Sequence, residues 1–235
     1  PNWVSGELVS EIVKKLLRRW LGDAESFHAL GRSLPGNVTS ELGLMIGDLA
    51  DLVRQNRQLA DYLEKASDAD FDQGLDNIPD SEAFRRKLEQ FMQRYGMRCP
   101  GEIDISKPRW REAPTALVPA IMSHARTMAP GEHRAKFQEA AQEAEEVAEK
   151  LIEQVRRRKG AVHAKILRRL IHVYRNLAGL REHHKYLLVQ YFDIYRKAIL
   201  ELAHELVRSG VLREKQDVFY FTLDELQALE NGDIP

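Results

Sequence analysis

The sequence has a single cysteine, Cys99, in 235 residues. One cysteine excludes an internal disulfide and a zinc site built from several cysteines, and it favours a reducing compartment such as the cytoplasm. No apolar run approaches the ~20 residues of a membrane-spanning helix. The chain opens on Pro1, without an initiator methionine or the basic-then-apolar order of a signal peptide, so we expect it to be a fragment.

The sequence also contains none of the short motifs that mark a self-sufficient active site. The glycine-rich phosphate loops GxGxxG and GxxxxGK[ST] do not occur, and neither does the GxSxG elbow of hydrolases. The histidines are scattered, and His204-Glu205 is not followed by the second histidine of an HExxH zinc motif. We therefore predict no metal site and no complete catalytic set in this chain.

The positive and negative charges are nearly balanced. The sequence has 35 Lys and Arg and 36 Asp and Glu, which gives a formal net charge of -1. This balance argues against a dedicated nucleic-acid-binding protein. Charge is uneven only locally, because residues 151–215 hold 15 basic and 6 acidic side chains. We interpret Arg156–Lys159 as a solvated helix end whose cations complement the helix dipole. An adaptor that binds a partner through its basic helix stays an alternative.

What the sequence does contain is a helical hydrophobic period along most of its length. Hydrophobic residues make up 43% and charged residues 30% of the chain, as in folded globular proteins. The pattern predicts a mostly α fold, a bundle of long helices with a structured Pro-rich loop and at most a short β element near the C-terminus. Helices are predicted over residues 6–21, 23–30, 38–63, 81–95, 132–159, 161–178 and 180–208, with a strand at Asp217–Phe221 and a last short helix after it.

Local signals place several helix ends and contacts. Asn37 is a candidate N-cap, and Thr222 with Glu225 matches a capping box. Gly43 and Gly47, four residues apart, permit the close approach of another helix. We divide the chain into an N-terminal lobe, 1–119, which includes a Pro-rich loop at 96–119, and a long-helix lobe, 120–235. The sequence leaves open whether the two lobes form one domain.

The Pro-rich loop is predicted to be ordered. It contains Pro100, Pro108, Pro114 and Pro119, yet it keeps Ile103, Ile105 and Trp110 in a charged context. Ordering such a segment is costly unless its charges are paired. We therefore predict a partly buried Trp110, and internal pairing of Arg98, Glu102, Asp104 or Arg109. A loop that is part of the architecture and makes no ligand contact is the alternative interpretation.

Three cationic or titratable side chains share one face near the start of the helix predicted at 180–208. Arg181, His184 and Lys185 stand at positions i, i+3 and i+4. Cations at a helix N-terminus oppose the helix dipole, and a bound anion could offset that cost. An ordinary charged helix face is the alternative interpretation.

Two segments resemble a known enzyme family. The run from Phe91 to Pro114, FMQRYGMRCPGEIDISKPRWREAP, resembles the central region of multidomain phosphotransferases related to phosphoenolpyruvate synthase, and most closely the rifampicin phosphotransferases. Gly210-Val211-Leu212, followed by the run from Asp217 to Leu226, is similar to the segment before the mobile phosphohistidine domain of that family. Both matches stand in the expected order, so the resemblance covers nearly the whole chain.

The resemblance implies a three-part enzyme. An ATP-grasp domain binds ATP and Mg²⁺, a swivelling domain carries a phosphorylated histidine, and a largely helical middle domain receives the acceptor, a hydroxyl of a rifamycin. This chain is similar to the middle domain, so the isolated chain is expected to be inactive and to hold no cofactor. Ser123-His124-Ala125 matches three letters of the carrier motif, but its flanks differ, and His124 is interpreted as an ordinary helix residue.

The same resemblance implies the site residues. Arg181 and Lys185 match an Arg and a Lys thought to line the acceptor pocket, where cations would stabilise charge on the transferring phosphoryl group. Leu187 matches an apolar wall position. Leu42, Met45, Ile46, Phe91 and Met92 are further wall candidates, and core packing is the alternative for each. A phosphoenolpyruvate-synthase-like enzyme with another acceptor is the second functional interpretation, because the sequence does not identify the acceptor.

Overall fold

The computed structural model describes residues 2–23 and 25–230, and in this part the chain is helical and contains no β-strand. The α-helices are α1 (Asn2–Leu21), α2 (Phe27–Leu30), α3 (Val38–Gln55), α4 (Arg57–Leu63), α5 (Phe71–Asp76), α6 (Glu82–Tyr95), α7 (Val118–Thr127), α8 (Glu132–Lys159), α9 (Ala161–Ala178), α10 (His183–Arg208) and α11 (Leu223–Glu230). Short 3₁₀ helices lie at η1 (Pro114–Leu117), η2 (Gly179–Glu182) and η3 (Lys215–Tyr220). The prediction of a mostly α fold is confirmed.

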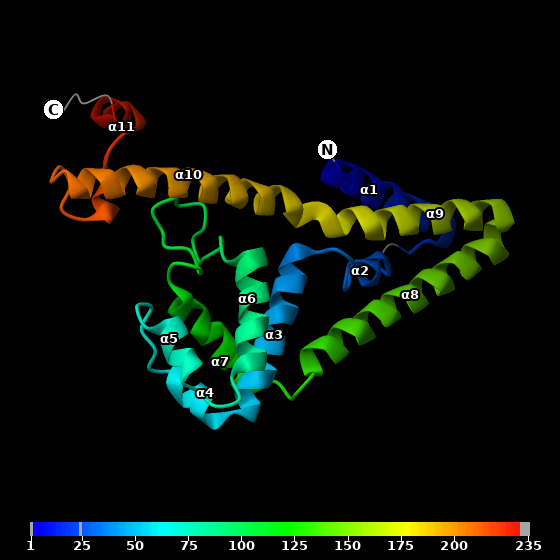
Figure 1. Cartoon of the computed structure of the whole chain (residues 1–235). Coiled ribbons are helices and arrows are strands. Elements are labelled where there is room, and N and C mark those ends of the chain that lie inside the picture. The colour runs from blue at the N-terminus through cyan, green and yellow to red at the C-terminus, as the bar shows by residue number, and fades with distance from the viewer. Residues whose placement is uncertain (1, 24, 231–235) are drawn as a thin grey trace.

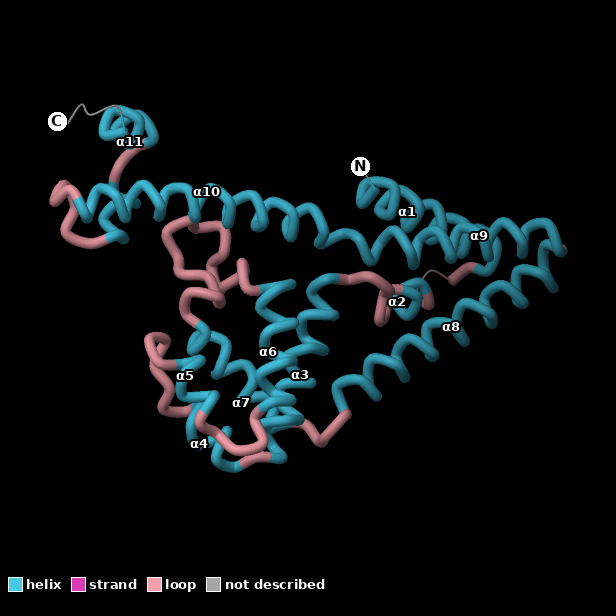
Figure 2. The backbone as a smooth tube through the Cα atoms, viewed as in Figure 1, coloured by secondary structure: helices cyan, strands magenta, loops and turns pink. Residues whose placement is uncertain are grey.

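The long helices form an open frame around a compact bundle (Figures 1 and 2). Helices α9 and α10 follow one another as a nearly continuous rod, and α8 runs back from the far end of α9 toward the bundle of α3 to α7. Helix α1 lies along α9, and α11 lies over the C-terminal end of α10. The segment between α6 and η1 reaches from the bundle to one side of α10.

Three hydrophobic clusters hold this arrangement together. The first joins α3, α4, α5, α6 and α7, the second joins α1 and α2 to α8 and α9, and the third joins the end of α10 to η3 and α11. Helices from both predicted lobes therefore contribute to each of the first two clusters. The division of the chain at residue 119 stays a prediction.

The local signals that the sequence offered are confirmed at three places. The side chain of Asn37 accepts hydrogen bonds from the backbone N–H groups of Thr39 and Ser40, which caps α3. Thr222 and Glu225 exchange the hydrogen bonds of a capping box. Gly47 is buried against the ring of His133 on α8, and a Cβ added there would overlap that ring. The same prediction is wrong for Gly43, where an added Cβ would meet nothing within 4 Å.

The strand prediction for Asp217–Phe221 is wrong. This segment folds as η3, fixed at its start by reciprocal hydrogen bonds between Glu214 and Asp217. Val218 is completely buried in the third cluster. A short continuous apolar run forms a strand only where a neighbouring strand completes its hydrogen bonds. Here α10 and α11 are the elements that pack against the segment, so a 3₁₀ turn satisfies the backbone locally.

Other boundaries also differ from the prediction. A helix at 23–30 shortens to α2, and the helix predicted over 38–63 is interrupted at Asn56, whose side chain caps α4. The acidic stretch before residue 80 contains α5. The Pro-rich loop ends earlier than predicted, because η1 begins at Pro114 and α7 accommodates Pro119 in its first turn, where a missing N–H costs nothing.

The segment Gly96–Ala113 is ordered and braced internally, as predicted. The Arg98 guanidinium pairs with the Glu102 carboxylate, and the backbone N–H of Trp110 donates to the Arg98 carbonyl at 2.9 Å. The partly buried Trp110 ring lies 5.6 Å from the ring of Phe91, centroid to centroid. We call Gly96–Ala113 the clamp loop, because its side chains hold α10.

Candidate functional site

The junction between α9 and α10 positions the two cations that the sequence singled out. Gly179 at the start of η2 packs directly on the carbonyl of Pro35, and any Cβ there would collide with that backbone. The chain then passes through one 3₁₀ turn before α10 begins at His183. Arg181 therefore lies on η2 and Lys185 on the first turn of α10, on one continuous stretch of chain.

Arg181 is exposed, and its guanidinium lies 3.3 Å from the carboxylate of Glu182. It borders a cavity of about 310 Å³ that α1, α2 and the end of α9 enclose, and Lys14 and Tyr174 also line this cavity. Burial raises the pKa of the Tyr174 phenol, so its hydroxyl stays protonated and can donate a hydrogen bond. The cavity keeps space open beside Arg181.

Lys185 is held by the clamp loop. Its ammonium lies 3.0 Å from one carboxylate oxygen of Glu102, a side chain that is almost completely buried. The guanidinium of Arg98 grips the same carboxylate at 2.7 and 2.8 Å. Burial by itself would raise the pKa of Glu102, but the hydrogen bonds from Arg98 and Lys185 outweigh it and lower the pKa below its ordinary value. Glu102 is therefore ionised at neutral pH.

The neighbouring residue Tyr186 fixes the start of α10 to the bundle. Its hydroxyl donates a hydrogen bond of 2.8 Å to the carbonyl of Arg94, and its ring lies edge-on to that of Tyr95, 6.1 Å away. Burial raises the pKa of Tyr95 to about 12. Helix α10 thus meets the bundle through Tyr186 and the clamp loop through Lys185.

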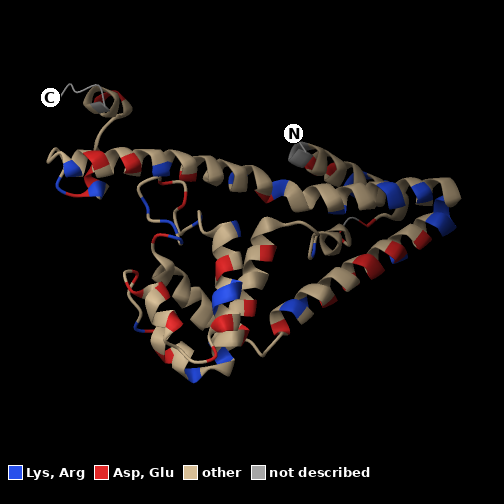
Figure 3. Cartoon of the chain, viewed as in Figure 1, with Lys and Arg blue, Asp and Glu red and all other residues tan. Residues whose placement is uncertain are grey.

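Further along, the face of α10 that is turned toward the protein is charged. Arg196 is completely buried and donates to the carboxylate of Glu112 and, at 2.7 Å, to the carbonyl of Ile105. Asp193 is also buried and lies 3.4 Å from the guanidinium of Arg111. Figure 3 shows charged residues of the clamp loop beside this side of α10.

The opposite face of α10 is apolar and open to solvent. At 100° per residue, its members lie on the other side of the helix from Asp193 and Arg196. Each of them is between 44% and 60% exposed: Leu187, Leu188, Tyr191, Ile194 and Tyr195. We call these five side chains the outer face. Contiguous exposed apolar patches on soluble proteins are typical of sites that bind a partner or a ligand.

An ordinary surface helix turns its apolar side to the core and its charged side to solvent. Helix α10 does the opposite over this stretch, and we call it the inverted helix. The clamp loop satisfies its charged side, and solvent meets its apolar side. At the C-terminal end, α11 covers α10 with Leu226 and Leu229, both buried. Leu188, three residues after Lys185, is its neighbour on the helix surface, so the outer face borders Lys185 near the start of α10.

Arg181, Lys185 and Leu187 lie on this one stretch of chain, but Lys185 faces the clamp loop and Leu187 points to the other side of α10. The other wall candidates lie elsewhere. Phe91 is completely buried in the first cluster, where Met45 and Leu42 are partly buried and Ile46 is buried. This position gives Phe91 a core role.

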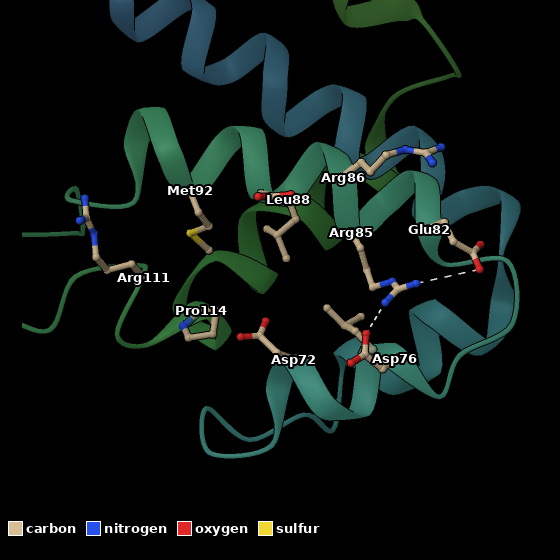
Figure 4. Close-up of a pocket in the computed structure, with 11 residues that line it drawn as sticks. Asp72, Asp76, Glu82, Arg85, Arg86, Leu88, Met92, Arg111 and Pro114 are labelled. Carbon is tan, nitrogen blue, oxygen red and sulfur yellow. Dashed lines mark hydrogen bonds and ion pairs between the residues drawn. The ribbon is translucent and has the colours of Figure 1, made fainter.

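Met92 alone among the wall candidates lines the cavity of about 550 Å³ between α5, α6 and the clamp loop (Figure 4). This cavity went unnoticed in the sequence because its walls come from separate elements. Arg85 pairs there with Asp76 and lies 4.0 Å from Glu82, so the lining mixes both signs of charge. Leu75, Leu88 and Pro114 supply apolar contacts. The mixture does not select one class of ligand.

Sequence reasoning also missed the partner of Lys185. It predicted that Glu102 pairs with another residue of the loop, which is confirmed for Arg98, but it did not link Glu102 to a helix more than 80 residues away. No local pattern in the loop marks α10 as the second partner of Glu102, because this contact joins segments that are far apart in the sequence. His124 lies on α7, as predicted.

Among residues 2–23 and 25–230, no three His, Cys, Asp or Glu side chains gather to hold a metal ion. No helix among the described residues is long and apolar enough to cross a bilayer.

Comparison with known proteins agrees with the resemblance. A family model described as the fourth domain of rifampicin phosphotransferase matches residues 1–182. The chain is 35% identical over 215 residues to a rifampicin phosphotransferase of Bacillus subtilis, which covers 91% of this chain and 25% of that protein. It is 38% identical over 210 residues to a rifampicin phosphotransferase of Streptomyces sviceus, and this match covers 89% of this chain and 24% of that protein. The chain thus spans about a quarter of the length of these curated relatives.

Proposed function

The chain belongs to the rifampicin phosphotransferase family, and we propose that it is the part of such an enzyme that binds the acceptor, a rifamycin. ATP, Mg²⁺ and the phosphohistidine belong, in this proposal, to other domains of the same parent chain. The isolated chain is then a binding domain without turnover of its own. We further propose a cytoplasmic location, which the single cysteine supports.

The observation that carries this proposal is the inverted helix α10. A rifamycin is a large, mostly apolar macrocycle with a few hydroxyl groups, so its site should offer a broad apolar surface with few polar anchors. The outer face offers five exposed apolar side chains, two of them tyrosines. Tyrosine supplies a flat apolar body together with a polar hydroxyl.

In this proposal the cations at the start of α10 meet the incoming phosphoryl group. Arg181 and Lys185 lie within two turns of the outer face, and both side chains are partly exposed. During phosphoryl transfer, negative charge spreads over the oxygens of the transferring group, and preorganised cations stabilise it. A guanidinium can hold two of these oxygens at once, and an ammonium adds a mobile point charge.

Each group of residues then has a distinct task in the proposed reaction. The outer face binds the antibiotic and excludes water from one side of it. Arg181 and Lys185 orient the accepting hydroxyl and screen the incoming phosphoryl group. The clamp loop holds α10 so that these two surfaces keep a fixed relation.

Binding measurements on the full-length phosphotransferase test the proposal. Tyr191→Ala removes a large exposed ring from the outer face, and we expect it to weaken rifamycin affinity about tenfold, as the loss of about 1.4 kcal/mol of apolar contact would. Val162→Ala is the matched control, because Val162 is 71% exposed on α9 and lies outside the outer face.

Equal rifamycin affinity in wild type, Tyr191→Ala and a Leu187→Asp variant would contradict the proposal. An intact phosphotransferase that transfers phosphoryl to a different hydroxyl compound, with no affinity for rifamycins, would instead favour the phosphoenolpyruvate-synthase-like interpretation.

A further inference from the structure

We propose that Glu102 is a positioning residue, whose buried carboxylate fixes the ammonium of Lys185 at the edge of the outer face. This inference rests on the acceptor-binding function proposed above and names the residue on which its cation depends. Glu102 itself touches no reacting atom. It acts through Lys185.

The carboxylate of Glu102 contacts two cations, the rigidly held guanidinium of Arg98 and the flexible side chain of Lys185. Arg98 donates to both carboxylate oxygens, from Nε at 2.8 Å and from Nη2 at 2.7 Å, and this two-point contact stops the carboxylate from rotating. Lys185 has four rotatable carbon–carbon bonds, and its Nζ lies 3.0 Å from Oε1 of Glu102. The fixed carboxylate therefore selects one position for an ammonium that would otherwise move freely.

The backbone of Glu102 is braced as firmly as its side chain. Arg109 is completely buried, and its Nη1 donates to the Glu102 carbonyl at 3.0 Å and to the thiol of Cys99 at 3.2 Å. The backbone N–H of Arg111 closes the clamp loop on the carbonyl of Gly96 at 3.0 Å. Glu102 thus belongs to a braced loop, from which it reaches α10.

Exposure separates this contact from the other ion pairs between the clamp loop and α10. The side chain of Arg196 is 0% exposed and that of Asp193 is 7% exposed, so both are shielded from a ligand at the outer face. The side chain of Lys185 is 43% exposed although its partner is only 6% exposed. An ammonium has three donors, so Lys185 can hold Glu102 with one and keep the others for an oxygen that approaches from solvent.

The charge of the cluster suits this task. Glu102 is shared between Arg98 and Lys185, so one carboxylate faces two cations and the cluster keeps a net positive charge. Glu102 can therefore fix Lys185 without cancelling its attraction for an anionic oxygen. A simple one-to-one ion pair would lose most of that attraction.

A double-mutant cycle in the full-length phosphotransferase tests the inference. The four proteins are wild type, Glu102→Gln, Lys185→Ala and the double variant, and kcat, KM for a rifamycin and Tm are measured for each. We expect Glu102→Gln to lower kcat roughly tenfold to hundredfold, the scale of a misplaced catalytic group, with KM little changed. In the Lys185→Ala background, Glu102→Gln should cause no further loss of kcat. Glu102→Asp should restore part of the turnover.

Asp104→Asn is the control, because Asp104 is an exposed carboxylate of the same loop that bonds to Ser106. It should leave kcat unchanged. If Glu102→Gln fails to fold, Arg98→Lys loosens the two-point contact while it keeps the carboxylate, and the same loss of kcat is expected.

The outcomes separate the two proposals. Equal losses of kcat from Glu102→Gln with and without Lys185 would overturn the positioning role, because they would show that Glu102 acts through the fold. Wild-type turnover in Glu102→Gln, with a loss in Lys185→Ala, would overturn the positioning role alone. Wild-type turnover in Lys185→Ala would overturn this inference together with the role proposed for Lys185.

Discussion

The guanidinium of Arg196 is completely buried and grips the carboxylate of Glu112, from Nε at 2.9 Å and from Nη2 at 2.6 Å. Glu112 lies near the end of the clamp loop, and Arg196 lies in the middle of α10. The guanidinium also lies 5.0 Å over the ring of Phe219. One side chain thus ties the clamp loop, α10 and η3 together.

Replacing Arg196 should destabilise the fold strongly. Arg196→Ala leaves Glu112 and the carbonyl of Ile105 without their donor, and breaking a buried ion pair on one side costs about 3–5 kcal/mol. The free energy of unfolding in urea measures this loss. Arg208→Ala is the control, because Arg208 is exposed at the end of the same helix, and it should change stability by less than about 0.5 kcal/mol. A similar small effect at Arg196 would contradict its tying role.

Acid should weaken the contact between α3 and the start of α8. Asp48 accepts hydrogen bonds from Arg134 at 2.6 Å, and His133 and Lys87 lie 3.1 and 3.2 Å away. Burial opposes ionisation, but these partners outweigh it and hold the pKa of Asp48 well below its ordinary value. A lowered pKa in the folded state means that the stabilisation is present above pH ~4 and is lost as the pH falls further.

Asp48→Asn tests this pH dependence. The variant should lose about 2 kcal/mol at pH 7, the worth of hydrogen bonds to a charged group, and the difference from wild type should shrink between pH 4 and pH 2. Asp61→Asn is the control, because Asp61 is exposed on α4 and pairs only at 4.0 Å with Arg57. A difference that stays constant with pH would show that the ionisation of Asp48 does not contribute.

The cations at the start of α10 should affect turnover more than binding. Lys185→Ala in the full-length enzyme should lower kcat by ~10²–10³, because the loss of one electrostatic contact to developing charge costs about 2.7–4 kcal/mol. Arg181→Lys should also lower kcat, since a lysine ammonium cannot make the two parallel hydrogen bonds that the planar guanidinium of arginine makes. Rifamycin affinity should change little in both.

Steady-state kinetics and equilibrium binding of a rifamycin separate these effects, with Tm as the check on folding. Lys197→Ala is the matched control, a half-exposed lysine on the same helix that pairs with Asp193. If turnover is unchanged in both Arg181→Lys and Lys185→Ala, the two cations belong to an ordinary solvated helix face.

The isolated chain should be inactive as a phosphotransferase. The proposal assigns ATP and the phosphohistidine to other domains, so incubation of the 235 residues with ATP, Mg²⁺ and a rifamycin should produce no AMP. Chromatographic measurement of AMP against a blank without protein checks this result. AMP formation above the blank would refute the assignment of the catalytic parts to other domains.

The sequence by itself determined the helices, because their signals are local. A 3.6-residue period, the cap at Asn37 and the capping box at Thr222 and Glu225 need only neighbouring residues, and the structure confirms them. Gly47 was also found in this way, since a small residue on a periodic face predicts a close contact. Local signals failed at Asp217–Phe221, where a short apolar run predicts a strand but no partner strand lies among the described residues.

Only the tertiary structure decided which side of α10 faces solvent. The periodicity marks Leu187, Tyr191 and Ile194 as apolar, and an apolar stripe ordinarily turns toward the core. Here Glu102 and Glu112, more than 80 residues away in sequence, form ion pairs with Lys185 and Arg196 on the charged side of the helix. Burying those charges in pairs is compatible with the fold only if the apolar side points outward. A contact between distant segments therefore creates the candidate site, and no local pattern encodes such a contact.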